Sequence, residues 1–237
     1  PARLNWSSHM SEQAEATAYW NRRADSFDAQ YDALAVHKLV TRKIVERLRP
    51  RAGDRCIDLG VGTARLYGDY QQDFLSCESL IGIDFSPVML EIAAEQCRLA
   101  GLTRFRALQS TFTAVPLPDA DADCISSSLA LHHVPDDGKR AALGEAKRLA
   151  RPGCRIVIAD QMNCTGAALS DDAFNQLMLD TFFPGPTEAR SAKSASGHKE
   201  YSCSLETMQQ LFVEAGLRPH AEKVNDVIGI VYAEIPH

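Results

Sequence analysis

The 237-residue sequence predicts a single α/β domain with a mostly parallel β-sheet flanked by helices. Short apolar segments alternate with segments of helical periodicity, an order that implies parallel strands joined by right-handed crossovers. The most informative segment, residues 55–66, joins a short buried strand to a turn with two glycines and then to a helix. A strand, a glycine turn and a helix N-terminus in this order are typical of a nucleotide-binding α/β domain.

The first half of the chain alternates between helices and strands. We expect strands at residues 55–59, 80–83 and 105–108 and helices at residues 11–31, 36–48, 63–70 and 88–100. The last of these helices has the clearest boundaries. Ser86 is a good N-cap, Pro87 suits the first helical position, and Gly101 suits the C-terminal stop.

The second half completes the sheet. Strands are expected at residues 123–127, 155–159, 220–224 and 227–234, and helices at residues 138–150, 167–182 and 205–215. A tight turn at Asn225-Asp226 joins the last two strands. Residues 183–202 contain several prolines, glycines and serines and are expected to form a long loop.

Composition limits the partners of the chain. Residues 1–9 end in Ser-Ser-His before Met10 and are interpreted as a vector-derived tail, so the domain is expected over residues 10–237. The 25 basic and 31 acidic residues give a formal net charge of −6, which argues against binding nucleic acid by charge. The sequence shows no apolar run long enough to span a bilayer and no signal peptide, so no membrane partner is expected.

The seven cysteines indicate a reducing compartment. Their number is odd and no two of them form a CxxC pair. Cys56, Cys124 and Cys154 fall in expected buried strands, where a thiol packs as a small apolar group. We therefore expect a reduced, cytoplasmic protein without a metal site.

Motifs in four segments, residues 58–63, 82–90, 127–134 and 149–154, are similar to those of one known family. Together they resemble the class I S-adenosylmethionine (SAM)-dependent methyltransferases. The resemblance is to the small-molecule subgroup (type 11 domain) that includes the ubiquinone and menaquinone methyltransferases. It implies a Rossmann-like, seven-stranded sheet whose last strand inserts antiparallel beside the strand at residues 155–159.

The resemblance places SAM at the glycine turn, with S-adenosylhomocysteine as the product. Backbone N–H groups of the turn suit the carboxylate of SAM, and Asp58 suits its ammonium. Asp84 suits both ribose hydroxyls, since a carboxylate accepts two hydrogen bonds. The expected SAM contacts are Tyr19, Asp58, Gly60, Gly62, Thr63, Asp84, Phe85, Met89, Thr111, Phe112 and Ser128.

Two features of this site, the contact with the adenine amine and the role of the N-terminal helix, each have an alternative. The family often places an acid after the third strand to receive the adenine amine, but residues 109–113 contain none, so Thr111 or the backbone is expected to substitute. The helix at residues 11–31 resembles the N-terminal helix that caps the cofactor, with Tyr19 as its contact. The alternative is a peripheral helix that packs its aromatic side chains on the core.

His132 and His133 are the candidate catalytic residues. They follow the strand at residues 123–127, at the edge where ligands bind in open α/β sheets. Histidine titrates near neutral pH, so either could take a proton from the acceptor as the methyl group moves. The alternative is a structural role in closing the loop, with catalysis supplied by holding the nucleophile against the methyl group.

An insertion over about residues 161–203 is expected to form a substrate lid together with the N-terminal helix, because long loops in compact domains are often lids. Its cations suggest an acidic acceptor, and the alternative is a solvated loop. The candidate acceptor contacts are Tyr31, His133, Phe183, Arg190, His198 and Tyr201.

The sequence therefore predicts in-line methyl transfer from SAM to O, N, S or C of a small molecule, in secondary metabolism, by a monomer or homodimer. One alternative is a NAD(P)-dependent oxidoreductase, which would prefer an apolar residue at Asp58 and a third glycine near Arg65. The other is a non-catalytic module that binds a protein partner, against which the intact glycine turn and acids argue.

Overall fold

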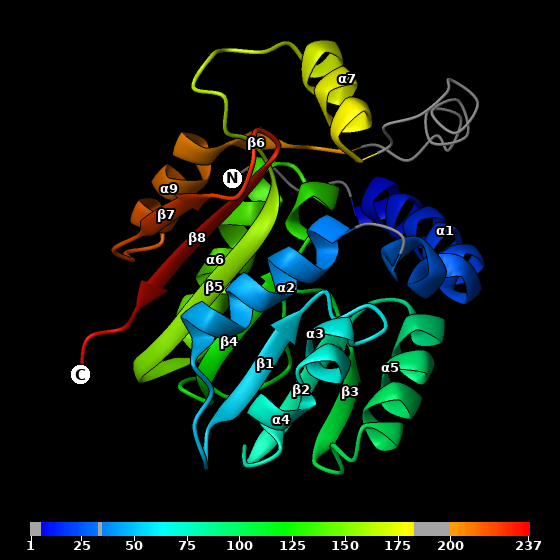
Figure 1. The fold of residues 1–237 in the computed structure, drawn as a ribbon, viewed down its shortest axis with the longest axis vertical. Coiled ribbons are helices and arrows are strands. Elements are labelled where there is room, and N and C mark those ends of the chain that lie inside the picture. Colours follow the sequence, from blue (N-terminus) through cyan, green and yellow to red (C-terminus); the bar gives the residue numbers. More distant parts are fainter. Residues whose placement is uncertain (1–5, 33–34, 183–199) are drawn as a thin grey trace.

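The computed structural model describes residues 6–32, 35–182 and 200–237, and shows a sheet covered by helices on both faces (Figure 1). The strand order is β3-β2-β1-β4-β5-β8-β7, and β8 runs antiparallel to both of its neighbours. This confirms the predicted Rossmann-like fold with its antiparallel last strand. The strands are β1 Arg55–Leu59, β2 Ser79–Asp84, β3 Phe105–Gln109, β4 Ala122–Ser128, β5 Ala150–Asn163, β6 Cys203–Ser204, β7 His220–Lys223 and β8 Ile228–Glu234.

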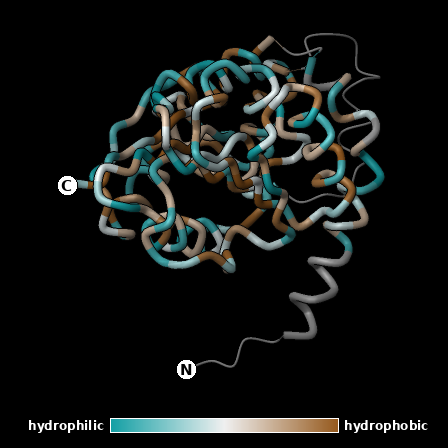
Figure 2. The backbone as a smooth tube through the Cα atoms, turned by 90° about the horizontal axis from the view of Figure 1, so that it is seen from below, coloured by the Kyte–Doolittle hydropathy of each residue, from teal (hydrophilic) through white to brown (hydrophobic). Residues whose placement is uncertain are grey.

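The helices form two layers around the sheet. Residues of α2, α3, α5 and α7 pack in one apolar cluster, and residues of α6 and α9 pack in the other. The more hydrophobic stretches of the chain accordingly run through the interior in Figure 2. The helices are α1 Trp6–Asp32, α2 Ala35–Leu48, α3 Arg65–Asp69, α4 Gln71–Phe74, α5 Pro87–Leu99, the 3₁₀ turn η1 Leu131–His133, α6 Asp136–Leu149, α7 Asp171–Phe182 and α9 Leu205–Glu214.

The side chains of β1 alternate between these two layers. Cys56 packs with the cluster of α2, α3 and α5, whereas Ile57 and Leu59 pack with the cluster of α6. Because successive strand residues face opposite sides, Asp58 points to the same side as Cys56, where α3 follows the glycine turn. The sheet thus places this carboxylate at the C-terminal end of β1, where ligands bind in such folds.

Several element boundaries differ from the sequence prediction. The helix after the glycine turn begins at Arg65 instead of Thr63, because Ala64 has a left-handed backbone with φ 63°. The helix predicted from residue 167 begins at Asp171, where the Ser170 hydroxyl accepts from the N–H of Ala173. β5 runs through Asn163, so residues 161–163 belong to the sheet and not to the insertion. β6 adds a short eighth strand, which pairs with the end of β5.

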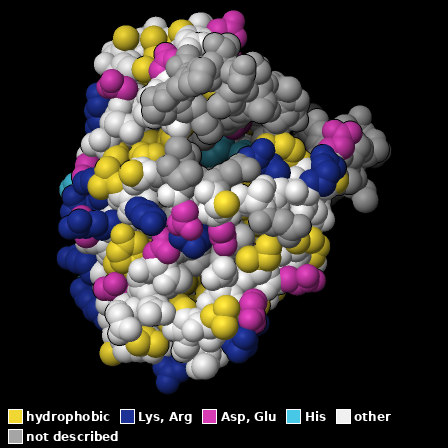
Figure 3. Space-filling model, turned by 45° about the vertical axis from the view of Figure 1, so that its right-hand side comes forward, with side chains coloured by type: hydrophobic (Ala, Val, Ile, Leu, Met, Phe, Trp, Pro, Cys, Tyr) yellow, Lys and Arg dark blue, Asp and Glu magenta, His cyan; other side chains and the backbone are white. Residues whose placement is uncertain are grey.

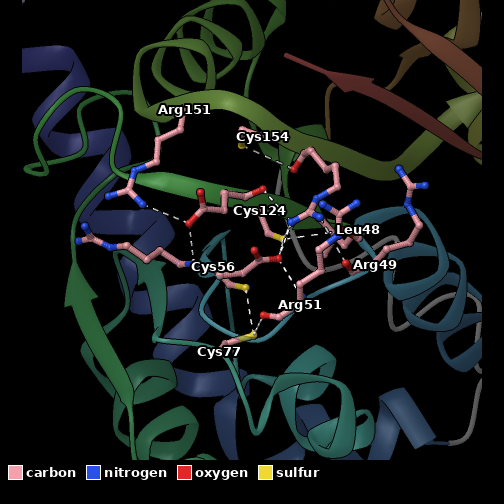
Figure 4. A network of polar contacts seen from close by, with 12 residues as sticks. Leu48, Arg49, Arg51, Cys56, Cys77, Cys124, Arg151 and Cys154 are labelled. Atoms are coloured by element: carbon pink, nitrogen blue, oxygen red, sulfur yellow. Dashed lines mark hydrogen bonds and ion pairs between the residues drawn. The ribbon is translucent and has the colours of Figure 1, made fainter. Parts of the chain in front are cut away.

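A buried polar network lies at the opposite, N-terminal edge of the sheet (Figure 4). Arg155 forms an ion pair with Asp54 and lies 2.9 Å from Sγ of Cys124. Sγ of Cys56 lies 3.7 Å from Sγ of Cys77, and all seven cysteines are free thiols. These contacts connect β5 to β4 and to the segment before β1, and β1 to the segment before β2. They lie far from the strand ends that carry the glycine turn, and we assign them a structural role.

Candidate functional site

A pocket opens at the C-terminal ends of β1, β2 and β4. It contains about 790 Å³ of empty space, its open mouth included. Figure 3 shows the side of the molecule that carries α1, where the visible acidic and basic side chains are mixed. The pocket brings together many of the residues predicted from the sequence: Asp58, Gly60, Gly62, Thr63, Asp84, Phe85, Met89, Phe112, Ser128 and His133.

The glycine turn forms the floor of this pocket. Gly60 and Gly62 have φ values of 77° and 53°, in the left-handed region that favours glycine. The N–H groups of Gly60 and Val61 donate to the Ile83 carbonyl at 2.8 and 2.9 Å. A Cβ at Gly60 would lie 2.5 Å from Cβ of Ala130, so the turn is held between β2 and the segment after β4.

Asp58 is a buried carboxylate, 2% exposed, at the end of β1. Burial raises the pKa of Asp58 to about 6, and the negative charge of the nearby Asp84 adds to the rise. The hydrogen bond that Asp58 accepts from the Ser126 hydroxyl at 2.8 Å acts in the opposite direction. Among the residues described by the structure, no Lys or Arg pairs with Asp58. A buried carboxylate without a countercharge is suited to bind a cationic group of a ligand.

Asp84 stands at the end of β2, on the other side of the turn. Its carboxylate accepts from the N–H of Ser86 at 2.9 Å and from the N–H of Gly62 at 3.0 Å. Burial raises the pKa of Asp84, and these backbone hydrogen bonds act in the opposite direction. The side chain thus fixes the shape of the glycine turn and lines the pocket.

The N-terminal helix contributes aromatic wall residues that the sequence analysis did not select. Trp20 and Phe27 line the pocket, with ring centroids 6.0 Å apart, whereas Tyr19 lies outside it and packs edge-on against Trp20 at 5.2 Å. Trp20 and Phe27 are seven residues apart and therefore share one helix face. This spacing is the sequence signal that could have identified them.

Polar contacts fasten α1 to the rest of the site. The Thr63 hydroxyl donates to Asp28 of α1 at 2.7 Å, and the Ser86 hydroxyl donates to Oδ1 of Asn21 at 2.7 Å. Since Thr63 belongs to the glycine turn and Ser86 caps α5, these bonds place α1 across the pocket. The remaining wall residues missed from the sequence are Thr41, Val61, Arg65, Leu66, Leu129 and Ala130.

The two candidate catalytic histidines occupy different positions. His133 lines the pocket, and its ring packs against Trp20 with centroids 4.9 Å apart. His132 does not line it; its ring lies 3.9 Å from that of His133, and Nδ1 is 2.5 Å from Oδ1 of Asp160. Asp160 lies 28 residues along the chain from His132 and was not among the residues predicted for the site.

The other residues predicted to contact SAM or the acceptor either lie outside the pocket or are not among the residues that the structure describes. Thr111 lies outside the pocket, and its hydroxyl pairs with that of Thr113 at 3.1 Å. Tyr201 lines a second, more polar hollow between α7 and β6, and its N–H donates to the His132 carbonyl at 2.6 Å. The side chain of Tyr31 and the residues Phe183, Arg190 and His198 lie outside the described part of the structure.

No grouping of three or more His, Cys, Asp or Glu side chains in residues 6–32, 35–182 and 200–237 is arranged to hold a metal ion. In the same ranges, no helix has both the length and the apolar character that crossing a bilayer requires.

The chain is similar to known methyltransferases. A family described as "methyltransferase domain" matches residues 56–153. An uncharacterized methyltransferase of Geobacillus kaustophilus is 27% identical, over 90% of this chain and 91% of that protein. The ubiquinone/menaquinone biosynthesis C-methyltransferase of Hahella chejuensis is 28% identical, over 62% of this chain and 61% of the relative. The solved structure of a SAM-dependent methyltransferase from Aquifex aeolicus shares the fold, with a TM-score of 0.60, 20% identity, and coverage of 91% of this chain and 98% of that one.

Proposed function

The chain carries a methyltransferase domain and resembles the class I SAM-dependent methyltransferases of the ubiquinone/menaquinone type, and from this premise we propose that it methylates a small molecule. One observation carries the proposal: a buried carboxylate without a countercharge, Asp58, lies beside a glycine turn in a mostly apolar pocket. SAM has the groups that such a pocket could bind, namely an ammonium, a carboxylate, two ribose hydroxyls and an adenine ring.

The residues of the pocket fit SAM by their chemistry. Asp58 would pair with the ammonium. The N–H groups of Gly60, Val61 and Gly62 already donate to Ile83 and Asp84, so within the turn the N–H of Thr63 would be offered to the carboxylate. Asp84 would accept from the ribose hydroxyls. Phe85, Met89 and Phe112 would pack on the adenine. Space is left for the ligand at Gly62, where Phe27, at 4.0 Å, is the only neighbour among the described residues that an added Cβ would have within 4 Å.

The sulfonium of SAM supplies an electrophilic methyl group when it is bound. The chain would then hold an O, N, S or C nucleophile of the acceptor in line with that group, which converts a bimolecular encounter into an oriented reaction. Trp20 and Phe27 would exclude water from the pocket, as caps over active sites do. His132 and His133 are the candidates to accept a proton that the acceptor loses.

The surroundings of the site support a small acceptor. The net charge of −6 is poorly suited to a nucleic-acid backbone. We propose a monomer or homodimer that works in the cytoplasm, where the seven free thiols would stay reduced, and a role in secondary metabolism.

SAM should bind the purified chain with a dissociation constant in the micromolar range, and NAD should not bind. Asp58 would repel the pyrophosphate of NAD, whereas it attracts the ammonium of SAM. Isothermal titration calorimetry with each ligand measures the difference. Tight NAD binding without SAM binding would favour the oxidoreductase, and binding of neither would favour a non-catalytic module.

The affinity for SAM should rise as the pH increases from about 5 to about 7, because the ammonium pairs with the ionised form of Asp58. Burial raises the pKa of that carboxyl to about 6, so the protonated form competes with binding below this pH. The folding stability of the ligand-free chain should change with pH in the opposite direction. The raised pKa means that protonation favours the folded state, so the contribution of Asp58 to stability falls as the pH rises towards about 6.

Calorimetry at constant ionic strength tests this pH dependence in the wild type and in Asp58→Asn. The variant should bind SAM more weakly and lose most of the slope, since it has no charge to titrate. An equal slope in both proteins would show that the ammonium lies elsewhere.

A further inference from the structure

Two thiols of the polar network at the N-terminal edge of the sheet are in direct contact (Figure 4). The Cys56 thiol, near the start of β1, donates a hydrogen bond to Sγ of Cys77, and the two sulfur atoms lie 3.7 Å apart. Cys77 lies just before β2, which pairs in parallel with β1, so the sheet holds the two segments side by side. A disulfide places its sulfur atoms about 2 Å apart, so a small movement of the segment that carries Cys77 would close the bond.

Cys77 is the member of this pair that lies nearer to solvent. Its side chain is buried, but it belongs to the turn between α4 and β2, and its neighbours Ser76 and Glu78 are exposed. Backbone hydrogen bonds of 3.0 and 2.8 Å connect this turn to the segment before β1. Cys56, in contrast, is buried within a strand that has β2 and β4 on its two sides. Because surface turns open more readily than central strands, a small oxidant should reach Cys77 first.

The surroundings of the two thiols favour Cys77 as the reacting thiolate. The hydrogen bond that it accepts from Cys56 lowers the pKa of the Cys77 thiol. Burial and the Asp54 carboxylate act in the opposite direction, and the positive charge of Arg155 adds to the lowering. Hydrogen bonds with Cys124 and Cys77 raise the pKa of Cys56, so this thiol stays protonated. Since the thiolate is the nucleophilic form of cysteine, both access and charge select Cys77.

A third thiol, Cys124, competes for the same partner. It is the register partner of Cys56 on the neighbouring strand β4. Its sulfur lies 2.9 Å from a guanidinium nitrogen of Arg155, and its S–H donates to Asp54 at 3.4 Å. Cys124 lies between β1 and β5 in the centre of the sheet, and it is buried. Cys77 is therefore the better partner for Cys56, because it is the one that a turn at the surface carries.

We propose that Cys56 and Cys77 are a reversible oxidation site, in which a hydroperoxide oxidises Cys77 and Cys56 then closes a disulfide. The Cys77 thiolate attacks one peroxide oxygen, the oxygen–oxygen bond breaks, and the sulfur becomes a sulfenic acid. The other oxygen takes up the proton of Cys77 and leaves as water or an alcohol. The Cys56 sulfur displaces the sulfenic hydroxyl, which leaves as water with the Cys56 proton. The two thiols thus lose two electrons and two protons, and the peroxide is reduced.

The disulfide protects Cys77 from further oxidation. Without a neighbouring thiol, a sulfenic acid can go on to the sulfinic and sulfonic acids, which are irreversible for most proteins. With Cys56 in contact, the sulfenic acid is instead consumed, and an added thiol can reduce the disulfide by exchange. This proposal concerns the thiols of the chain alone and does not depend on methyl transfer.

The first test treats the purified full-length chain with hydrogen peroxide and then blocks the remaining thiols with N-ethylmaleimide. Mass spectrometry should show a product that has lost two hydrogen atoms, and dithiothreitol should restore the original mass. Cleavage after Arg65 and Glu78 puts Cys56, Cys77 and Cys97 into three different peptides, so the linked pair can be identified. We expect a link between Cys56 and Cys77.

The second test removes each thiol in turn. In Cys56→Ser, Cys77 should gain two or three oxygen atoms that dithiothreitol does not remove, because the thiol that consumes the sulfenic acid is missing. Cys77→Ser should lose the disulfide and leave Cys56 unoxidised under the same treatment. Cys154→Ser is the matched control, since Cys154 is also a buried strand thiol but its sulfur contacts the Arg155 carbonyl, at 3.9 Å. This control should form the wild-type disulfide.

Three results would overturn the proposal. They are a link between Cys56 and Cys124, a wild-type Cys77 that takes up oxygen without forming a disulfide, and thiols that all stay reduced in peroxide. Cys56→Ala replaces Cys56→Ser if the buried hydroxyl prevents folding, and circular dichroism of each variant checks this. The wild-type measurement decides the question in any case, because it needs no substitution.

Discussion

Asp84→Ala should lower the affinity for SAM about ten- to a hundredfold, because a charge-assisted contact with the ribose is worth on the order of 1.5–3 kcal/mol. The thermal unfolding midpoint should fall as well. The carboxylate also accepts the N–H groups of Gly62 and Ser86 at 3.0 and 2.9 Å. Each buried donor left unpaired costs about 1–3 kcal/mol. Calorimetry and differential scanning calorimetry measure the two effects separately.

A ligand analogue separates the ribose contact from the loosened turn. Wild-type protein should prefer S-adenosylhomocysteine over its 2′-deoxy analogue, because the analogue lacks a hydroxyl that Asp84 would accept from. Asp84→Ala should bind both ligands weakly and with nearly equal affinity. If the variant keeps the wild-type preference, Asp84 acts only by shaping the glycine turn and does not contact the ribose.

The fold was predictable because its strands and helix ends carry local signals. Ser86 caps α5 by accepting from the N–H of Met89 at 3.2 Å, as its position before Pro87 predicts. Ser204 caps α9 in the same way, through the N–H of Thr207 at 3.0 Å. Asn225 closes the last turn by accepting from the N–H of Ile228 at 2.8 Å. Each signal involves residues within a few positions of one another, so one sequence is enough to find it.

The parts that escaped prediction depend on contacts between distant segments. The rotation of α1 about its axis, set by docking onto Thr63 and Ser86, decides that Trp20 and not Tyr19 lines the pocket. Asp160 meets His132 only because β4 and β5 are neighbours in the sheet. Ala64 has a left-handed backbone, so α3 begins later than predicted. A glycine or asparagine would have indicated such a backbone in the sequence, and this position has neither.

Gly60→Ala should destabilise the chain by about 2–5 kcal/mol and abolish measurable SAM binding. The φ of 77° costs an alanine about 1–2 kcal/mol, because its Cβ crowds the following carbonyl. The new methyl would also lie 2.5 Å from Cβ of Ala130, and such overpacking adds about 1–3 kcal/mol. Relieving the clash must move the glycine turn or the segment after β4, and both line the pocket. Urea unfolding and calorimetry with SAM measure the two losses.

Two further variants divide this loss into its causes. Gly101→Ala has the same backbone strain, with φ 76°, but no neighbour in the described part of the chain lies within 4 Å of its added Cβ, so it should cost only the strain and leave SAM binding unchanged. Gly60→Ala combined with Ala130→Gly removes the clash and keeps the strain. A double-mutant cycle over these two positions should therefore give a coupling of about 1–3 kcal/mol and partial recovery of SAM binding. Additive losses in that cycle would show that the contact with Ala130 does not hold the glycine turn, and that backbone strain alone explains the need for glycine.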